Sequence, residues 1–201
     1  MTGDVSGATE VVVVPTGTAN LASIRAAFGR LGADVVVSRE PERIAEASHV
    51  VLPGVGAFGA SIALVRESGA DAALAERIAA DRPTLAVCVG HQLLFRTSDE
   101  SPGAVGLGVV DAHVGRFVGD VRVPQFGWND VRGEGRFLRP GFAYFANSYR
   151  ALEAPGFDVA TADHGGAFVA AMERGRVLTC QFHPELSGAY GRALFERWLA
   201  C

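Results

Sequence analysis

The feature that most constrains the fold is a series of short apolar runs without polar–apolar alternation, several of which lead into a segment of helical periodicity. The runs are Val11–Val14, His49–Leu52 and Thr84–Cys88. Because both faces of such a strand are apolar, each is expected to lie buried in a parallel sheet. This alternation of strand and helix predicts an α/β fold, an open and mostly parallel sheet flanked by helices.

The other expected elements surround these strands. Helices are predicted from an N-cap at Asn20 to Gly32, at Ala60–Glu67, at Asp71–Ala80, from Gly90 to Arg96 and at Gly188–Leu199, with one more strand at Asp34–Val37. The segment Val105–Val131 is rich in Gly and carries few helical signals. Later strands, expected to form a partly antiparallel extension, are Tyr144–Ser148, Phe157–Ala162, Phe168–Glu173 and Val177–Phe182.

Length and composition fit one compact domain. The chain has 201 residues, 49% of them hydrophobic, without internal repeats. We expect residues 1–201 to form a single domain, with about residues 1–9 outside its ordered part. The formal net charge is −4 and the charges are interspersed, which argues against nucleic acid as a partner. The longest apolar run, residues 50–65, is broken by Pro53 and three Gly, so no membrane helix is expected.

Two residue types narrow the chemistry. All 18 basic residues are Arg, and without Lys the chain has no Schiff-base nucleophile, no anchor for pyridoxal phosphate and no P-loop. No cofactor and no metal are expected. The three Cys residues, Cys88, Cys180 and Cys201, are widely spaced and odd in number. They favour free thiols in a reducing, cytoplasmic compartment over a disulfide framework.

The strongest local motif surrounds Cys88. The apolar strand Thr84–Cys88 runs directly into a predicted helix, with Ala86 two residues before the thiol and Gly90 two residues after it. Small residues at these positions are typical of a nucleophile elbow, a strained turn that exposes a catalytic side chain at a helix N-terminus. An elbow alone does not distinguish a nucleophile from a buried structural Cys.

A thiol nucleophile requires a general base, and His183 is the best candidate. It ends an apolar strand, where Pro184 stops the strand and Glu185 can fold back to hold the imidazole tautomer. Cys88 and His183 then stand at the carboxyl ends of strands, the edge where open α/β sheets bind ligands. The other His residues follow the thiol too closely, open a strand or lie in turn-like segments: His91, His49, His113 and His164.

A glycine-rich loop follows the strand His49–Leu52. In Pro53-Gly54-Val55-Gly56 the two Gly can present backbone N–H groups without side-chain obstruction, as an oxyanion hole requires. By itself this loop is weak evidence, because most such loops are only turns.

Together these motifs resemble those of the class I, or triad, glutamine amidotransferases. The resemblance rests on Cys88-x-Gly90-x-Gln92 and, about 95 residues later, on His183-Pro184-Glu185. Further segments resemble the glutaminase subunits of imidazole glycerol phosphate synthase: Pro53–Gly59, Val123–Asn129 and Tyr144–Tyr149. The likeness runs from about Val11 to the C-terminus.

The resemblance implies a set of roles. Cys88 would attack the glutamine carboxamide, His183 would shuttle the proton, and Glu185 would orient the imidazole. The other implied contacts are the oxyanion backbone at Gly54, Val55 and Gly56 and, for glutamine itself, Gln92 with the backbone at Ser148 and Tyr149. The ammonia would pass to a (β/α)8-barrel cyclase subunit, bound as a heterodimer, in histidine biosynthesis.

The sequence departs from the family pattern at several positions, most of them expected near the subunit interface. They are the first loop, Pro15–Leu21, and Ala86, His91, Asn147 and Leu186. Two other interpretations stay open: a glutaminase that serves another synthase, such as those for anthranilate, GMP or pyridoxal phosphate, and a non-catalytic scaffold. The segment Val123–Asn129 argues against the first, and the complete triad argues against the second.

Overall fold

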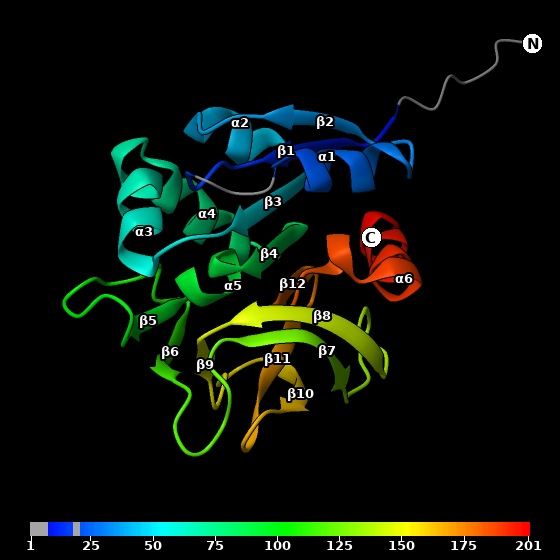
Figure 1. The fold of residues 1–201 in the computed structure, drawn as a ribbon. Coiled ribbons are helices and arrows are strands. Elements are labelled where there is room, and N and C mark those ends of the chain that lie inside the picture. The colour runs from blue at the N-terminus through cyan, green and yellow to red at the C-terminus, as the bar shows by residue number, and fades with distance from the viewer. Residues whose placement is uncertain (1–7, 18–20) are drawn as a thin grey trace, which may run out of the picture.

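A computed structural model describes residues 8–17 and 21–201, and a seven-stranded sheet runs through it (Figure 1). The strand order is β10-β11-β12-β4-β3-β1-β2. The strands are β1 (Glu10–Val13), β2 (Asp34–Val37), β3 (His49–Gly54), β4 (Thr84–Cys88), β10 (Asp158–Asp163), β11 (Ala167–Arg174) and β12 (Val177–Cys180). The N-cap expected at Asn20, and most of the segment expected to lack order, fall outside the described residues.

The pairing of these strands confirms the predicted fold class. Strands β2, β1, β3, β4 and β12 pair in parallel. Strands β10 and β11 continue the sheet antiparallel beyond β12. The sheet is therefore mostly parallel, with an antiparallel extension at one edge.

Burial follows the position of each strand in the sheet. Val11, Val12 and Val13 of β1 are completely buried, because β1 has a neighbour on each side and helices above and below. The equally apolar β2 is only half-buried, since it is an edge strand with β1 as its one neighbour. An apolar run predicts a strand here, but its place in the sheet decides how much of it is covered.

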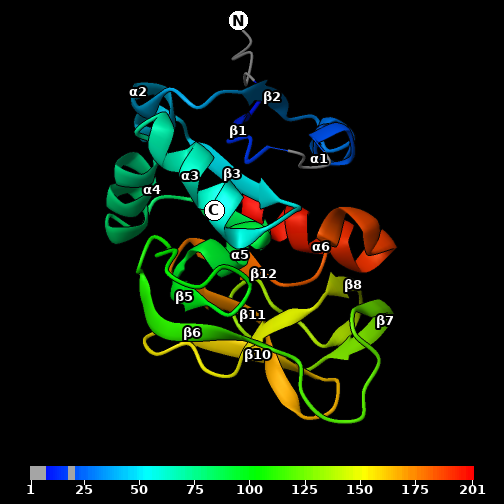
Figure 2. The same cartoon turned by 60° about the vertical axis from the view of Figure 1, so that its left-hand side comes forward.

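Helices cover both faces of the sheet (Figure 2). They are α1 (Leu21–Gly29), α2 (Pro41–Glu46), α3 (Phe58–Glu67), α4 (Ala70–Ala79), α5 (Val89–Leu93) and α6 (Gly188–Leu199), with the 3-10 turn η1 (Pro184–Leu186) before α6. On one face α1 packs against α6, where the rings of Phe28 and Phe195 lie 4.6 Å apart. On the other face lie α2, α3 and α4. None of the described helices is both long and apolar enough to cross a membrane.

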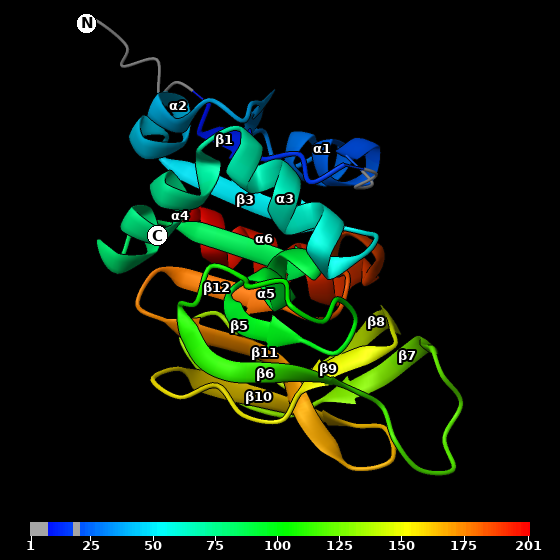
Figure 3. The same ribbon diagram turned by 90° about the vertical axis from the view of Figure 1, so that its left-hand side faces the viewer.

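A region of short strands lies beside the part of the sheet formed by β10, β11 and β12 (Figure 3). Strands β5 (Phe95–Ser98), β6 (Val110–Arg116) and β9 (Tyr149–Ala151) form a three-stranded sheet. Strands β7 (Gln125–Val131) and β8 (Gly141–Asn147) pair antiparallel over their full length. The Gly-rich segment after Pro102 therefore contains strands β6 and β7, whose bounds the sequence did not indicate.

Two expectations from the sequence are wrong at this level, and two short elements were missed. The helix predicted from Gly90 to Arg96 ends at Leu93, because Phe95 starts β5 and pairs with Val110 of β6. His113 lies within β6 and not in a turn, since it pairs with Thr97. Neither α2 nor β9 was expected, because each is too short to show a period of its own.

Candidate functional site

The turn that carries Cys88 is strained, as the elbow motif predicts. Cys88 has φ 54° and ψ −110°, a backbone conformation that residues other than Gly rarely adopt. A Cβ atom at Gly90 would lie 1.9 Å from the carbonyl oxygen of Leu52 in β3. Gly54, opposite Cys88 in the β3–β4 ladder, is also confined, since its Cβ would lie 2.8 Å from the nitrogen of Gly90. Both Gly are thus required for the loop after β3 to approach the elbow.

This packing predicts a large cost for adding one methyl group. We expect Gly90→Ala to lower the free energy of unfolding by about 3 kcal/mol, because a rigid backbone carbonyl cannot move aside. Chemical denaturation measures the effect. Gly29→Ala is the matched control, since a Cβ at Gly29 meets nothing within 4 Å. An unchanged stability for Gly90→Ala would contradict the tight approach of the two loops.

The helix after the elbow is shorter than the sequence suggested, and this limits its electrostatic effect. Helix α5 has five residues, little more than one turn. A macrodipole is the sum of the dipoles of aligned peptides. A helix this short therefore contributes little to holding a thiolate at Cys88. A nucleophile at Cys88 therefore depends more on a neighbouring cation than on this helix.

His183 supplies that cation. Its Nδ1 atom lies 2.8 Å from Oε1 of Glu185, and the side chains of both residues are almost fully buried. The ring also hydrogen-bonds with Cys88. Burial alone lowers the pKa of His183, but the hydrogen bonds and charges of Cys88 and Glu185 outweigh it and raise the pKa to about 10. At neutral pH the imidazole is therefore protonated, and it faces the sulfur as an imidazolium.

Two contacts fix the backbone of His183, and neither was predicted from the sequence. The hydroxyl of Ser187, which is buried, donates to the carbonyl oxygen of His183 at 2.6 Å and accepts from the N–H of Tyr144 at 3.0 Å. The N–H of His183 donates to the carbonyl oxygen of Tyr144 at 2.9 Å. These hydrogen bonds connect the η1 turn to strand β8, and they fix the position of the His183 backbone from which the imidazole extends.

Cys88 and His183 open into a cavity of about 300 Å³. Most of the residues implied by the resemblance line this cavity: Val55, Gly56, Gln92, Ser148 and Tyr149. Gly54 is not in its wall but is paired with Cys88 in the β3–β4 ladder. The structure therefore gathers the expected site residues, apart from Gly54 and Glu185, around one space large enough for a small amino acid.

Gln92 differs in detail from its expected role. Its Nε2 atom donates to Oε1 of Gln181 at 2.9 Å and to the carbonyl oxygen of Tyr149 at 3.4 Å. Its amide N–H groups are therefore engaged with the protein, which leaves its oxygen as the atom for a ligand. Gln181 in turn donates to the sulfur of Cys88 at 3.9 Å and is completely buried. The sequence analysis assigned no role to Gln181.

Glu100 is a second residue that sequence reasoning missed. It lines the cavity, and its Oε2 atom accepts the N–H of Phe58, the first residue of α3, at 2.7 Å. That contact fixes the carboxylate of Glu100 at the cavity wall. Among the described residues, no other acidic side chain lines this cavity. A carboxylate placed in this way suits a ligand that carries an ammonium group.

The remaining candidates have structural roles. His91 is fully buried and bonded to Thr179 at 2.6 Å, and burial lowers its pKa to about 3. Cys180 is also fully buried, and burial followed by the charges of Glu185 and Glu173 raises its pKa well above its ordinary value. Neither group is available as base or nucleophile in this state.

The departures from the family pattern at Ala86, His91, Asn147 and Leu186 lie in different parts of the fold. Ala86 and His91 are buried in the core, and Asn147 lines the cavity. Only Leu186 among these four is exposed, at 42%. Packing against β3 and β12 accounts for Ala86 and His91, whereas the expectation that most departures lie near a subunit interface stays a prediction.

Known proteins resemble this chain along almost its whole length. A model of the family described as glutamine amidotransferase class-I matches residues 12–200. The imidazole glycerol phosphate synthase subunit HisH of Symbiobacterium thermophilum is 36% identical over 195 residues, covering 94% of this chain and 92% of the relative. The HisH subunit of Mycolicibacterium paratuberculosis is 40% identical over 199 residues, covering 94% and 96%. The chloroplastic hisHF protein of Arabidopsis thaliana is 37% identical, but the match covers only 34% of that longer chain.

Solved structures share the fold at lower identity. A crystal structure of a glutamine amidotransferase superposes with a TM-score of 0.76 at 24% identity, covering 94% of this chain and 97% of the other. A chain of PurLQS from Thermotoga maritima superposes with a TM-score of 0.73 at 15% identity, covering 96% and 98%. At such identities the likeness concerns the arrangement of strands and helices.

Proposed function

We propose a function from the premise that this chain belongs to the class-I glutamine amidotransferases and, within them, to the HisH subunits of imidazole glycerol phosphate synthase. It hydrolyses glutamine to glutamate and ammonia, as the glutaminase subunit of a synthase in histidine biosynthesis. Cys88, His183 and Glu185 carry the reaction. The observation that supports these roles best is the position of the buried imidazole of His183, which lies between the sulfur of Cys88 and the carboxylate of Glu185.

The chemistry follows from the protonation state of the pair. The thiolate of Cys88 attacks the carboxamide carbon of glutamine, and a tetrahedral oxyanion forms. The imidazolium of His183 gives its proton to the departing nitrogen, so ammonia leaves and a glutamyl thioester stays on Cys88. Neutral His183 then takes a proton from water, and the hydroxide attacks the thioester. Glutamate leaves, and the thiolate–imidazolium pair is restored.

Backbone groups near the elbow stabilise the oxyanion in this proposal. Val55 and Gly56 line the cavity, and Gly54 is in register with Cys88. Gly56 has φ 109°, a conformation that Gly adopts without strain and other residues do not. A peptide at this position can turn with little steric cost, so the oxyanion donor is a natural point of control.

Glutamine enters as a zwitterion, and the cavity offers a partner for each charge. We assign its ammonium group to Glu100, which is anchored by Phe58, and to the free oxygen of Gln92. Its carboxylate is assigned to the backbone N–H groups at Ser148 and Tyr149. The carbonyls of both residues are already bonded, Ser148 to Phe117 and Tyr149 to Gln92, which keeps this stretch rigid.

The partner is assigned to an aromatic face beside the cavity. Phe126, Trp128 and Phe142 are each more than half exposed, on one side of the β7–β8 pair. Tyr144, on the same side, contacts Phe126 and Trp128 edge-on. Ala146 continues that side and lines the cavity. A (β/α)8-barrel cyclase docked here as a heterodimer would meet ammonia where it leaves Cys88.

The remaining parts of the proposal concern the setting of the chain. Residues 1–201 act as a single glutaminase domain without a cofactor, in the cytoplasm. The free thiols Cys88, Cys180 and Cys201 support a reducing compartment.

The activity of the subunit should depend on its partner. We expect the isolated chain to hydrolyse glutamine slowly, and the cyclase with its ribonucleotide ligand to accelerate it by about a hundredfold or more, the effect of one oxyanion donor. Glutamate release measures the rate for the subunit alone, with cyclase, and with cyclase and ligand. Ammonia without an acceptor is wasted, so control at this step is physically reasonable.

The same measurement tests the docking face. Trp128→Ser should weaken activation by the cyclase and leave the slow rate of the isolated chain unchanged, because Trp128 does not line the cavity. Arg25→Ser, at another exposed position, is the control. Equal rates under all three conditions would reject control by the partner. If glutamine is hydrolysed under none of the three conditions, the proposed glutaminase activity is rejected.

A further inference from the structure

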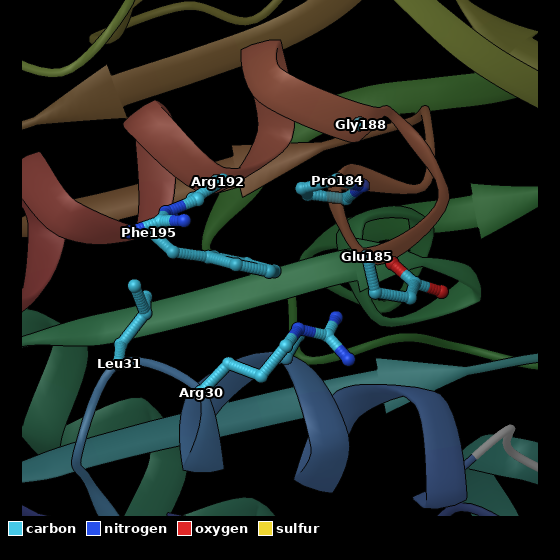
Figure 4. A pocket seen from close by; sticks show the side chains of 8 residues that line it. Arg30, Leu31, Pro184, Glu185, Gly188, Arg192 and Phe195 are labelled. Carbon is cyan, nitrogen blue, oxygen red and sulfur yellow. The ribbon is translucent and has the colours of Figure 1, made fainter.

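A second cavity, of about 250 Å³, borders the triad at Glu185 (Figure 4). It lies between α1 and the η1–α6 segment, with Leu31 and Phe195 as its apolar walls. Two Arg side chains reach it, Arg30 from the end of α1 and Arg192 from α6. No residue of the glutamine cavity takes part in this space, so it touches the reaction only through Glu185.

Glu185 has one satisfied oxygen and one unsatisfied oxygen. Oε1 is 2.8 Å from Nδ1 of His183, whereas Oε2 is buried without a hydrogen-bond partner among the described residues. Its side chain is only 3% exposed. A buried carboxylate oxygen without a donor is costly, because it has lost water and gained nothing in return. The site therefore calls for one more donor at this atom.

Arg30 is the donor that the cavity offers. Its guanidinium makes no hydrogen bond or ion pair with another residue in the described part of the chain, whereas Nε of Arg192 is bound to Glu196 at 2.9 Å. In Figure 4 the side chain of Arg30 runs along the cavity towards Glu185, and Arg192 lies at the other end beside Phe195. A long side chain with a planar fork of donors suits this carboxylate.

We propose that Arg30 is a positioning residue of the triad, whose guanidinium closes across the cavity and donates to Oε2 of Glu185. The inference rests on the proposed function, because it gives Arg30 a task only if Glu185 orients a catalytic imidazole. Held at both oxygens, the carboxylate keeps one rotamer and aims Nε2 of His183 at the sulfur. The charged groups around Glu185 are then His183 and Cys88 on one side, and Arg30 and Arg192 on the other.

The test compares Arg30→Met, which keeps the length of the side chain and removes its charge, with Arg30→Lys. We expect Arg30→Met to lower kcat about tenfold, the effect of one partly exposed charge-assisted hydrogen bond, and to leave KM for glutamine unchanged. Arg30→Lys should recover part of the loss. Removing a cation from beside Glu185 strengthens the pull of the carboxylate on the imidazolium. The alkaline limb of the pH–rate profile should therefore move to higher pH.

Two comparisons separate positioning from packing. Arg192→Met changes the same cavity at an Arg that is already paired, and it should leave kcat and the pH profile as they are. In a Glu185→Gln background, Arg30→Met should add no further loss, since the two side chains act through one contact. The proposal is overturned if Arg30→Met matches the wild type, or if its loss is the same with and without Glu185.

A second readout does not depend on glutamine turnover. The rate at which iodoacetamide alkylates Cys88, measured against pH in a Cys201→Ala chain, reports the thiolate–imidazolium pair directly. Arg30→Met should keep that pair to higher pH than the parent chain. If the parent chain fails to hydrolyse glutamine, the proposed function fails, and this profile still decides whether Arg30 acts on the pair.

Discussion

Cys88→Ala should abolish glutamine-dependent synthesis and spare synthesis from added ammonium salt. Only the first half-reaction uses the thiol, because ammonia in solution reaches the cyclase without it. Loss of a covalent nucleophile removes roughly 10⁴- to 10⁶-fold in rate, and the backbone and binding groups that stay behind supply the residual activity. The measurement is the rate of product formation by the subunit–cyclase complex with each nitrogen source.

The chain supplies its own control for this experiment. Cys180→Ala changes a buried thiol that is one strand away from Cys88 in the β4–β12 pair and lines neither cavity. We expect it to keep glutamine-dependent synthesis and to lose about 1 kcal/mol of stability from the small void. Near wild-type use of glutamine by Cys88→Ala would remove this residue from the reaction. Loss of activity with ammonium salt would mean that the substitution damages the complex.

The sequence predicted best the elements whose pattern is local. Strand β4 and helix α6 have the bounds that were expected, Thr84–Cys88 and Gly188–Leu199. Both combine an apolar pattern with a clear start or stop, such as the elbow after Cys88 and the Gly that opens α6. The tertiary contacts of β4 and α6 only reinforce a conformational preference that their own residues already have.

Elements set by distant partners were predicted poorly. Phe95–Ser98 continues the helical spacing of α5, yet it forms β5, because β6 offers it a parallel ladder. Tyr149–Ala151 is three residues long and becomes a strand only through its pairing with Val114–Arg116. Such pairing is decided by contacts that no window of sequence contains.

The candidate site divides in the same way. Cys88, His183 and Glu185 lie in short sequence motifs whose neighbouring residues indicate their chemical roles. These roles were therefore inferred without coordinates. Gln181 was within reach, since it precedes His183 by two and alternate residues of an extended chain share a side. Glu100 was not, because only the path of the chain after β5 brings its carboxylate to the N-terminus of α3.

The two partners of the thiol should differ in the size and in the pH dependence of their effects. His183→Ala should cost about as much as Cys88→Ala and at least as much as the loss of the carboxylate at Glu185. Glu185→Gln, which keeps the shape of the side chain, should cost roughly two powers of ten less, because it only orients and stabilises the imidazolium. The pKa of His183 is held near 10 by Cys88 and Glu185 together.

Replacing the carboxylate of Glu185 removes one of those two supports, so the pKa of His183 falls towards its ordinary value of 6.5. The imidazolium is then lost at lower pH, and the alkaline limb of kcat/KM moves down. The stability that the protonated ring lends the fold has the same sign. It is fully present below pH 6.5, where the unfolded chain is also protonated, and it is lost as the pH rises through about 10.

Rates of glutamate release between pH 6 and 10 for wild type and both variants measure the effects on the pH–rate profile. A limb that stays in place in Glu185→Gln would show that the carboxylate does not hold the proton on His183, and a milder loss at His183 than at Glu185 would reverse their roles.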